Sequence, residues 1–398
     1  MKILVVHEVD YLEKVIYEIH EFPELLAKAG HEVTFFQFQE GATRTNKNLF
    51  QEREISGRVY PEARIKLVGP HQFGLPAIDR LWATLSSWPA LFKVFREGRF
   101  DVVLNFAVPT FGLQVLTVAK LFGVPVVHRA LDVSHEIRES IYRLPILLVE
   151  KILYRLVGTL SANNTAMKNY CLRLSGRRKP SYVNYPPLDL VHFSSSPPDT
   201  ALRDQLGLKE QDKVITYMGS FFYFSGLPEC IHEFAKLAEG DRHLKLLLIG
   251  GGEQDKELRE LVIALGLAEN VIFTGFVPYS DLPKYLKLSS VAINPLKISR
   301  VAAVAFPHKV LQYLASGLTV VSTRLDGLVS AIDGVAGLHW ESSPEACLEK
   351  AVWLLRNEGS FRQPESVQAK LSELFAPEAA LKSLTKTLLM AVEVSTAK

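Results

Sequence analysis

The feature of this sequence that most constrains its fold is a repeated alternation of short β-branched runs with longer helical patterns. Such alternation is typical of βα units, which build mainly parallel sheets. The strands expected in the first half are Ile3–Val6, Val33–Phe36, Ile65–Val68, Val102–Leu104, Pro125–Val127 and Thr159–Ala162, with helices around Lys14–Ala29 and Pro145–Val157. In the second half the expected strands are Val214–Tyr217, Lys245–Ile249, Val271–Phe273, Val291–Ile293 and Thr319–Ser322. We therefore expect two α/β sheets.

The length of the chain, 398 residues, exceeds one ordinary domain core and predicts two domains. Residues 184–200 are rich in proline and serine and predict a linker, because proline interrupts helices and central strands. The predicted domains are residues 1–183 and 201–376. Residues 377–398 carry leucines at helical spacing and predict a closing helix that packs back towards the first domain.

Composition and motifs exclude several classes of protein. Lys plus Arg number 45 and Asp plus Glu 43, so no overall charge favours nucleic acid. Three widely separated cysteines without Cys-x-x-Cys spacing fit a reducing cytosol. The first apolar run, Ile3–Val6, is too short for a signal peptide. The uncharged run Val102–Ala119 is broken by Pro109 and Gly112, which indicates a βα unit rather than a membrane span. We therefore expect a cytoplasmic protein.

Two segments of the second half suit an anionic ligand. Gly250–Glu253 follows an expected strand, where glycines allow either close backbone approach to a phosphate or a simple turn, since the spacing G-x-G-x-x-G is absent. Further on, an irregular loop leads into a helix that opens near Pro307 and ends at Gly317. Lys309 lies at the unfavourable positive end of that helix, and Gln312 shares its face. Lys309 is therefore either a solvated lysine or the partner of an anion such as a diphosphate.

Taken together, these segments resemble family 4 of the retaining GT-B glycosyltransferases. The resemblance covers nearly the whole chain and rests on Met218–Ser220, Leu248–Glu253, Val271–Pro278, Asp281–Leu286 and Pro307–Gly317. It implies two Rossmann-like domains that face each other across a cleft. The second would bind a nucleoside diphosphate sugar and the first the acceptor, since ligands of open parallel sheets lie beyond the carboxyl ends of the strands.

The resemblance also implies which residues contact the donor. Phe276 and Val277 would meet the base, Gln312 the ribose hydroxyls, and the helix start the diphosphate. The expected donor contacts are Gly219, Ser220, Gly251, Gly252, Phe276, Val277, Phe306, Pro307, His308, Lys309 and Gln312.

In the first domain, Asp132–Glu136 is similar to an Asp-x-Trp-Pro-Glu element that some members place near the reacting sugar. Asp132 is the expected catalytic residue. The expected acceptor or sugar contacts are His7, Glu8, His128, His135 and Glu136. For His128 and His135 the alternative is a structural hydrogen-bonding role, which is common for histidines near strand ends.

Several positions depart from the family pattern. Ser220 and Ser225 replace its basic pair, and Val304 and Gln312 replace the glutamates of Glu-x7-Glu. Three functions stay open: sugar transfer to a hydroxyl of a glycan, lipid-linked or small-molecule acceptor, epimerisation of a nucleotide sugar, and binding of a sugar nucleotide without turnover. No metal or other cofactor is expected, since Asp-x-Asp and clustered His/Cys ligands are absent from the sequence.

One stripe of apolar residues has two interpretations. Basic residues are interleaved with it, and two of its members are tryptophans. The stripe suits either a buried core face or contact with the inner surface of a membrane. Its residues are Ile78, Leu81, Trp82, Leu85, Trp88, Phe92 and Phe95, with Arg80, Lys93, Arg96 and Arg99 between them.

Overall fold

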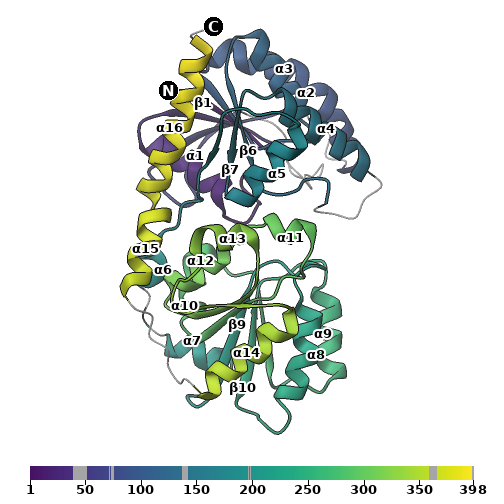
Figure 1. The fold of residues 1–398 in the computed structure, drawn as a ribbon, viewed down its shortest axis with the longest axis vertical. Helices are drawn as coiled ribbons and strands as arrows, with labels where there is room; N and C mark the ends of the chain where they lie inside the picture. Colours follow the sequence, from purple (N-terminus) through teal and green to yellow (C-terminus); the bar gives the residue numbers. More distant parts are fainter. Residues whose placement is uncertain are drawn as a thin grey trace. The chain divides into compact units, whose positions relative to one another are not determined.

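The chain folds into two compact units in a computed structural model (Figure 1). The first unit comprises residues 1–187 and 377–398, and the second comprises residues 188–376. The structure describes residues 1–38, 52–70, 72, 76–136, 142–195, 197, 199–357 and 365–396, so residues 196 and 198 of the expected linker and the side chain of Ile78 lie outside the described part.

The first unit is built on a sheet of eight strands in the order β3-β4-β2-β1-β5-β6-β7-β8. All of these pairings are parallel except that of β3 with β4. The strands are β1 Lys2–Val6, β2 Glu32–Phe36, β3 Arg53–Ser56, β4 Arg64–Val68, β5 Val102–Asn105, β6 Val126–Ala130, β7 Thr159–Ala162 and β8 Ser181–Val183. The six expected strands are confirmed. The edge strands β3 and β8 were missed because their short, mixed sequences lack an apolar run.

Helices cover both faces of this sheet (Figure 1). Helix α16 packs against α1, β5 and β6, and its Leu384 and Leu388 share one core with Val5 and Phe22. Helices α2, α3, α4 and α5 lie side by side in that order on the other face. The helices are α1 Glu18–Lys28, α2 Pro76–Gly98, α3 Gly112–Leu121, α4 Arg143–Leu156, α5 Thr165–Ser175 and α16 Pro377–Thr396. Among the helices that the structure describes, none combines the length and apolarity needed to cross a membrane.

The second unit is built on six parallel strands in the order β11-β10-β9-β12-β13-β14. The strands are β9 Lys213–Met218, β10 Leu244–Ile249, β11 Val271–Gly275, β12 Val291–Asn294, β13 Thr319–Thr323 and β14 Leu338–Glu341. Around them lie α6 Leu190–Ser194, α7 Thr200–Gln205, α8 Leu227–Leu237, α9 Asp255–Ala264, η1 Tyr279–Asp281, α10 Leu282–Leu286, α11 Arg300–Val304, α12 His308–Ala315, α13 Asp326–Ile332, α14 Pro344–Asn357 and α15 Glu365–Phe375. The five expected strands are confirmed.

Two details of the second unit differ from expectation. The half-buried edge strand β14 was missed. The loop expected to be irregular before Pro307 contains α11. The Ser299 side chain caps this short helix by accepting a hydrogen bond from the Ala302 N–H, and the alanines that follow favour helix.

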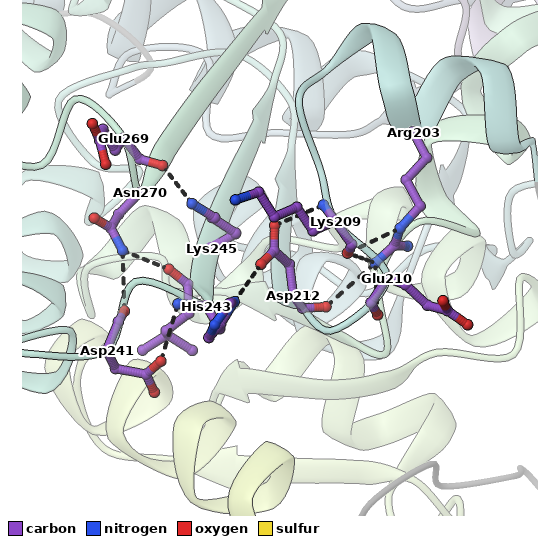
Figure 2. Close-up of polar contacts among 10 residues, drawn as sticks. Arg203, Lys209, Glu210, Asp212, Asp241, His243, Lys245, Glu269 and Asn270 are labelled. Carbon is purple, nitrogen blue, oxygen red and sulfur yellow. Dashed lines mark hydrogen bonds and ion pairs between the residues drawn. The ribbon is translucent and has the colours of Figure 1, made fainter.

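Polar side chains close the amino edge of the second sheet (Figure 2). The Asp212 carboxylate accepts the Lys209 N–H at 2.8 Å and lies 3.0 Å from Nδ1 of His243. The Asn270 amide donates to the Leu244 carbonyl at 2.9 Å, and the Lys245 ammonium also donates to a backbone carbonyl. Because these polar groups find their hydrogen-bond partners within the edge itself, we expect them to stabilise the fold. Ligands of parallel sheets bind at the carboxyl edge, so a binding site is expected there.

We expect Asp212→Ala to lower the free energy of unfolding by about 1–3 kcal/mol, because it removes the buried carboxylate that accepts the Lys209 N–H and contacts His243. Equilibrium urea unfolding measures this change. Glu260→Ala, an exposed carboxylate on α9, is the control and should have little effect. Equal stability of the two variants would contradict the structural role of Asp212.

Candidate functional site

Three loops pack against one another at the carboxyl edge of the second sheet. The Gly219 N–H after β9 donates to the Ile249 carbonyl at 2.9 Å, and the Gly250 N–H after β10 donates to the Gly275 carbonyl at 2.9 Å. The Phe221 N–H donates in turn into the glycine loop after β10. The residues that follow β9, β10 and β11 therefore form one continuous backbone surface.

The glycine run after β10 is required by this packing. Gly250 and Gly252 have φ angles of 130° and 154°, which side chains of other residues rarely adopt. A Cβ on Gly250 would lie 2.1 Å from the Gly219 carbonyl oxygen, and one on Gly252 would lie 2.8 Å from the Phe221 nitrogen. Close contact with the neighbouring loop thus explains these two glycines without a ligand.

Phe276 forms a flat apolar surface beside the same loop. Its side chain is 65% exposed, and a Cβ on Gly251 would lie 3.1 Å from its ring. The ring therefore lies over the Gly251 backbone, with the half-buried Val277 next in the chain. An exposed aromatic ring in this position suits stacking with a planar heterocycle.

Helix α12 is fixed with its first turn at the end of β9. The Tyr313 hydroxyl accepts the Met218 N–H at 2.6 Å, which ties the helix to the strand. At the start of the helix, Nζ of Lys309 lies 3.9 Å from the centroid of the Tyr217 ring. A Cβ on Gly219 would lie 3.2 Å from the same Nζ, so the ammonium group is beside the loop after β9.

Lys309 is a half-buried cation at the positive end of α12. Burial lowers its pKa from 10.5 to about 7. In the part of the chain that the structure describes, Lys309 forms no ion pair with a carboxylate. Burial disfavours the charge of Lys309, and the first N–H groups of a helix have no acceptor within the helix. Both features favour an anionic ligand over the alternative of a solvated lysine.

Other expected donor contacts near this helix have different surroundings. Pro307 is the residue before the first helical turn, and His308 begins the helix. Phe306 is buried with its ring centroid 6.0 Å from that of Phe375, so its side chain belongs to the core. Gln312 is buried on the same helix face as Lys309.

The serines at the family's basic positions do not replace the missing charges. Ser225 is 1% exposed and its hydroxyl accepts the Leu227 N–H at the start of α8. The Ser220 carbonyl accepts the Tyr217 hydroxyl at 3.0 Å. Val304, at the first glutamate position, lies in α11. The positive charge of Lys309 is therefore not supplemented by a charge at those positions.

In the first unit, Asp132 follows β6 and its side chain reaches solvent. Desolvation by the surrounding protein, and then repulsion from Glu18, raise its pKa from 3.8 to about 6. Glu18 begins α1 and forms a bidentate ion pair with the buried Arg129, at 2.5 and 2.9 Å. Asp132 is thus a carboxylate that changes charge near neutral pH.

The loop that carries Asp132 is fastened to α4. Nδ1 of His135 lies 2.6 Å from the fully buried Glu150 carboxylate, which also accepts the Tyr154 hydroxyl at 2.9 Å. Glu136 pairs with Arg143 at 2.8 Å. The contacts of His135 support the alternative of a structural role.

Of the remaining expected sugar contacts in the first unit, Glu8 and His128 are buried and His7 is half-buried. Glu8 accepts the N–H groups of Thr110 and Phe111 at 2.6 and 2.9 Å, just before α3 begins. His128 is fully buried in β6, and burial lowers its pKa to about 3. Burial, followed by the charge of Lys14, also lowers the pKa of His7 to about 3. Both histidines are therefore neutral at pH 7, and their contact with a sugar stays a prediction.

Sequence reasoning missed the aromatic residues that position the lysine. Tyr217 and Tyr313 occupy an expected strand and an expected helix, where aromatic residues ordinarily indicate core. The contact of the Tyr313 hydroxyl with Met218 and that of the Tyr217 ring with Lys309 join residues far apart in the chain. In the part of the chain that the structure describes, no group of three His, Cys, Asp or Glu side chains is arranged to hold a metal ion.

Comparisons with known proteins give a consistent picture. The family described as glycosyltransferase family 4 matches residues 19–192, and the family described as glycosyl transferases group 1 matches residues 212–357. The chain is 24% identical over 241 residues to 2-deoxystreptamine glucosyltransferase of Streptomyces kanamyceticus, covering 56% of this chain and 60% of that protein. It is 22% identical over 309 residues to alpha-monoglucosyldiacylglycerol synthase of Streptococcus pneumoniae, covering 75% and 65%. The chain thus spans less than two thirds of the length of these relatives.

The fold is shared with Anabaena HepE, whose crystal structure in complex with UDP-glucose has a TM-score of 0.77 at 17% identity, over 98% of this chain and 100% of that one. Two units of parallel βα architecture, with the candidate residues at the carboxyl edges of their sheets, define the GT-B class. Within it, the chain belongs to the group 1 glycosyltransferases of family 4.

We expect nucleoside diphosphates to bind more weakly as the pH rises above 7. The free protein then holds a neutral Lys309, so binding must take up a proton, and affinity should fall by up to about tenfold per pH unit. At pH 6.5 or so, Lys309→Ala should weaken binding by about 1.5–3 kcal/mol, the strength of a hydrogen bond to a charged group.

Isothermal titration calorimetry across this pH range measures both effects. Lys309→Met in the same buffers corrects for titration of the ligand itself. A variant with the same affinity and pH dependence as the unaltered protein would place the diphosphate elsewhere.

Proposed function

We propose that this chain transfers a hexosyl residue from a UDP-sugar to a hydroxyl of a glycan, lipid-linked or small-molecule acceptor, with retention of configuration at the anomeric carbon. The observation that carries the proposal is the half-buried Lys309 at the start of α12, on the same sheet edge as the exposed ring of Phe276. The structure of HepE with UDP-glucose and the two glucose-transferring relatives support UDP and a hexose as the donor.

In this proposal the second unit binds the donor. The uracil ring stacks on Phe276 over Gly251, and the diphosphate lies at the first turn of α12. As the bond to the sugar breaks, negative charge grows on the departing diphosphate. Lys309 and the helix amides stabilise that charge, which is the largest electrostatic demand of the reaction. The leaving group then needs no divalent cation.

The first unit supplies the acceptor side and Asp132. A double displacement would require an activated nucleophile against the anomeric carbon. We propose instead that the diphosphate oxygen accepts the proton of the incoming hydroxyl on the face from which the diphosphate leaves. Asp132 orients a sugar or acceptor hydroxyl, or stabilises positive charge on the sugar ring. His135, held by Glu150, keeps the Asp132 loop in place.

The proposal places the protein in the cytoplasm, with reversible contact at the inner face of a membrane. Trp82 and Trp88 on α2 support this location, because their side chains are 39% and 37% exposed. Tryptophan combines an apolar ring with a polar N–H and is suited to the boundary between lipid and water.

We expect Asp132→Asn to lower kcat about a hundredfold or more with a smaller change in donor affinity, because it removes a charge that acts in the transition state. In the unaltered enzyme, kcat/KM should fall below pH 6 by about tenfold per unit as Asp132 becomes protonated. Asp101→Asn, at the opposite edge of the same sheet, is the matched control. Full activity of Asp132→Asn would reject the assignment, and an inverted product by NMR would reject the mechanism.

We expect turnover of the UDP-sugar to require an acceptor hydroxyl and to continue in the presence of a chelator. A screen of UDP-sugars by thermal stabilisation selects the donor, since a ligand at 100 times its Kd adds about 2.7 kcal/mol of stability. Product analysis with and without an acceptor panel then measures transfer. Conversion of the donor without acceptor would identify an epimerase, and binding without turnover over a broad panel would identify a silent subunit. Activity that chelation abolishes and magnesium restores would contradict metal independence.

A further inference from the structure

Helix α2 exposes a stripe of large apolar side chains on its outer side. The inner side of the same helix is buried, including Ala83, Leu91 and Phe95. The core interpretation is therefore wrong for most of the stripe that the sequence singled out, since its described members other than Phe95 are exposed. The exposed side chains are Leu81 at 74%, Trp82 at 39%, Leu85 at 65%, Trp88 at 37% and Phe92 at 41%.

The stripe continues onto the next helices of the layer. The ring centroid of Phe92 lies 6.0 Å from that of Phe122, which follows α3 and is itself exposed beside Leu121. Helix α4 packs next to α3 and exposes Leu144 and Leu148. These helices lie side by side in Figure 1. We call this surface the apolar face: Leu81, Trp82, Leu85, Trp88, Phe92, Leu121, Phe122, Leu144 and Leu148.

The charges around the apolar face are almost all positive. The acidic residues Asp79 and Glu150 of these helices are buried. The exposed basic residues on α2, α3 and α4 are Arg80, Lys93, Arg96, Lys120, Arg143, Lys151 and Arg155, against one exposed acidic residue, Glu97. Lys93 and Arg143 have carboxylate neighbours on other segments, Glu52 and Glu136. The face thus combines exposed apolar rings with a strong excess of positive charge.

We propose that the apolar face docks onto an anionic lipid bilayer. Helices with apolar residues on one face and flanking Lys and Arg lie in the interface of such membranes, with tryptophan at the level of the headgroups. Negative lipid headgroups attract nearby basic residues, and this attraction weakens as salt screens the charges. A second copy of this chain is a poorer partner, because a symmetric dimer through this face would place like charges opposite each other.

If the chain transfers sugars as proposed above, docking through this face also indicates the class of acceptor. Helix α4 contributes Leu144 and Leu148 to the face, and its buried Glu150 holds His135 in the loop of Asp132. The docked helix and the catalytic loop are therefore joined by the His135–Glu150 contact of 2.6 Å and by the Glu136–Arg143 ion pair of 2.8 Å. A hydroxyl carried by a lipid-embedded molecule is the acceptor that this arrangement serves.

Co-sedimentation with vesicles tests the docking. The full chain should bind vesicles of phosphatidylcholine with phosphatidylglycerol, bind pure phosphatidylcholine far more weakly, and dissociate as salt rises. Leu85→Ser combined with Trp88→Ser should weaken binding about tenfold or more through lost apolar contact. The control is Trp353→Ser, a tryptophan in the second unit that is 47% exposed.

A second pair of variants tests the charge. Arg96→Glu combined with Lys120→Glu should weaken vesicle binding, whereas Lys256→Glu, on the exposed side of α9, should not. Each variant should keep the melting temperature and the UDP affinity of the unaltered protein, because the substituted side chains are exposed and outside the donor site. This measurement separates loss of docking from loss of folding.

Vesicle binding that survives both double variants, or that is equal for neutral vesicles, would overturn the docking surface. Self-association that the Leu85→Ser/Trp88→Ser variant abolishes, without any vesicle binding, would overturn it in favour of a protein interface. Because sedimentation needs no turnover, docking can be confirmed even if sugar transfer is not found. Docking together with a preference for water-soluble acceptors over vesicle-borne ones would contradict the inferred acceptor.

Discussion

The second unit depends on the backbone hydrogen bonds that join the loops after β9, β10 and β11. Gly219 and Gly250 approach so closely that a side chain on Gly250 would collide with the Gly219 carbonyl. This contact fixes the end of β9, against which Tyr313 anchors α12. Lys309 and Phe276 are consequently held at the same edge, one beside Gly219 and the other over Gly251. The placement of cation and ring follows from main-chain packing.

Lys309 in the second unit and Asp132 in the first are titratable groups whose surroundings disfavour the charged form. Burial lowers the pKa of Lys309, whereas desolvation by the surrounding protein and repulsion from Glu18 raise the pKa of Asp132, so that both change charge near neutral pH. In each case the protein disfavours the charged form, and a substrate can restore it: a diphosphate for the lysine, a developing positive charge for the carboxylate. The amino edge of the second sheet shows the opposite arrangement. There Asp212 has hydrogen-bond partners in Lys209 and His243, so its role is to stabilise the fold.

Sequence reasoning predicted the sheets well, because β-branched runs record burial on both faces of parallel strands. It also placed Lys309 at a helix start, because proline and glycine mark helix ends. It failed for the edge strands β3, β8 and β14, and it could not foresee that Glu8 faces the start of α3 or that the Tyr313 hydroxyl contacts Met218. These contacts join positions whose proximity depends on the whole fold. The apolar stripe of α2 stayed ambiguous for the same reason, since periodicity shows a face but not what covers it.

We infer that burial disfavours the charged form of Lys309 and that the donor's diphosphate restores its charge. NMR titration of the Lys309 side chain, assigned by comparison with Lys309→Met, measures its pKa directly with and without UDP. We expect a pKa of about 7 for Lys309 in the free protein and a clear rise of this pKa when UDP binds. A free-state pKa at the ordinary lysine value, unchanged by UDP, would contradict it.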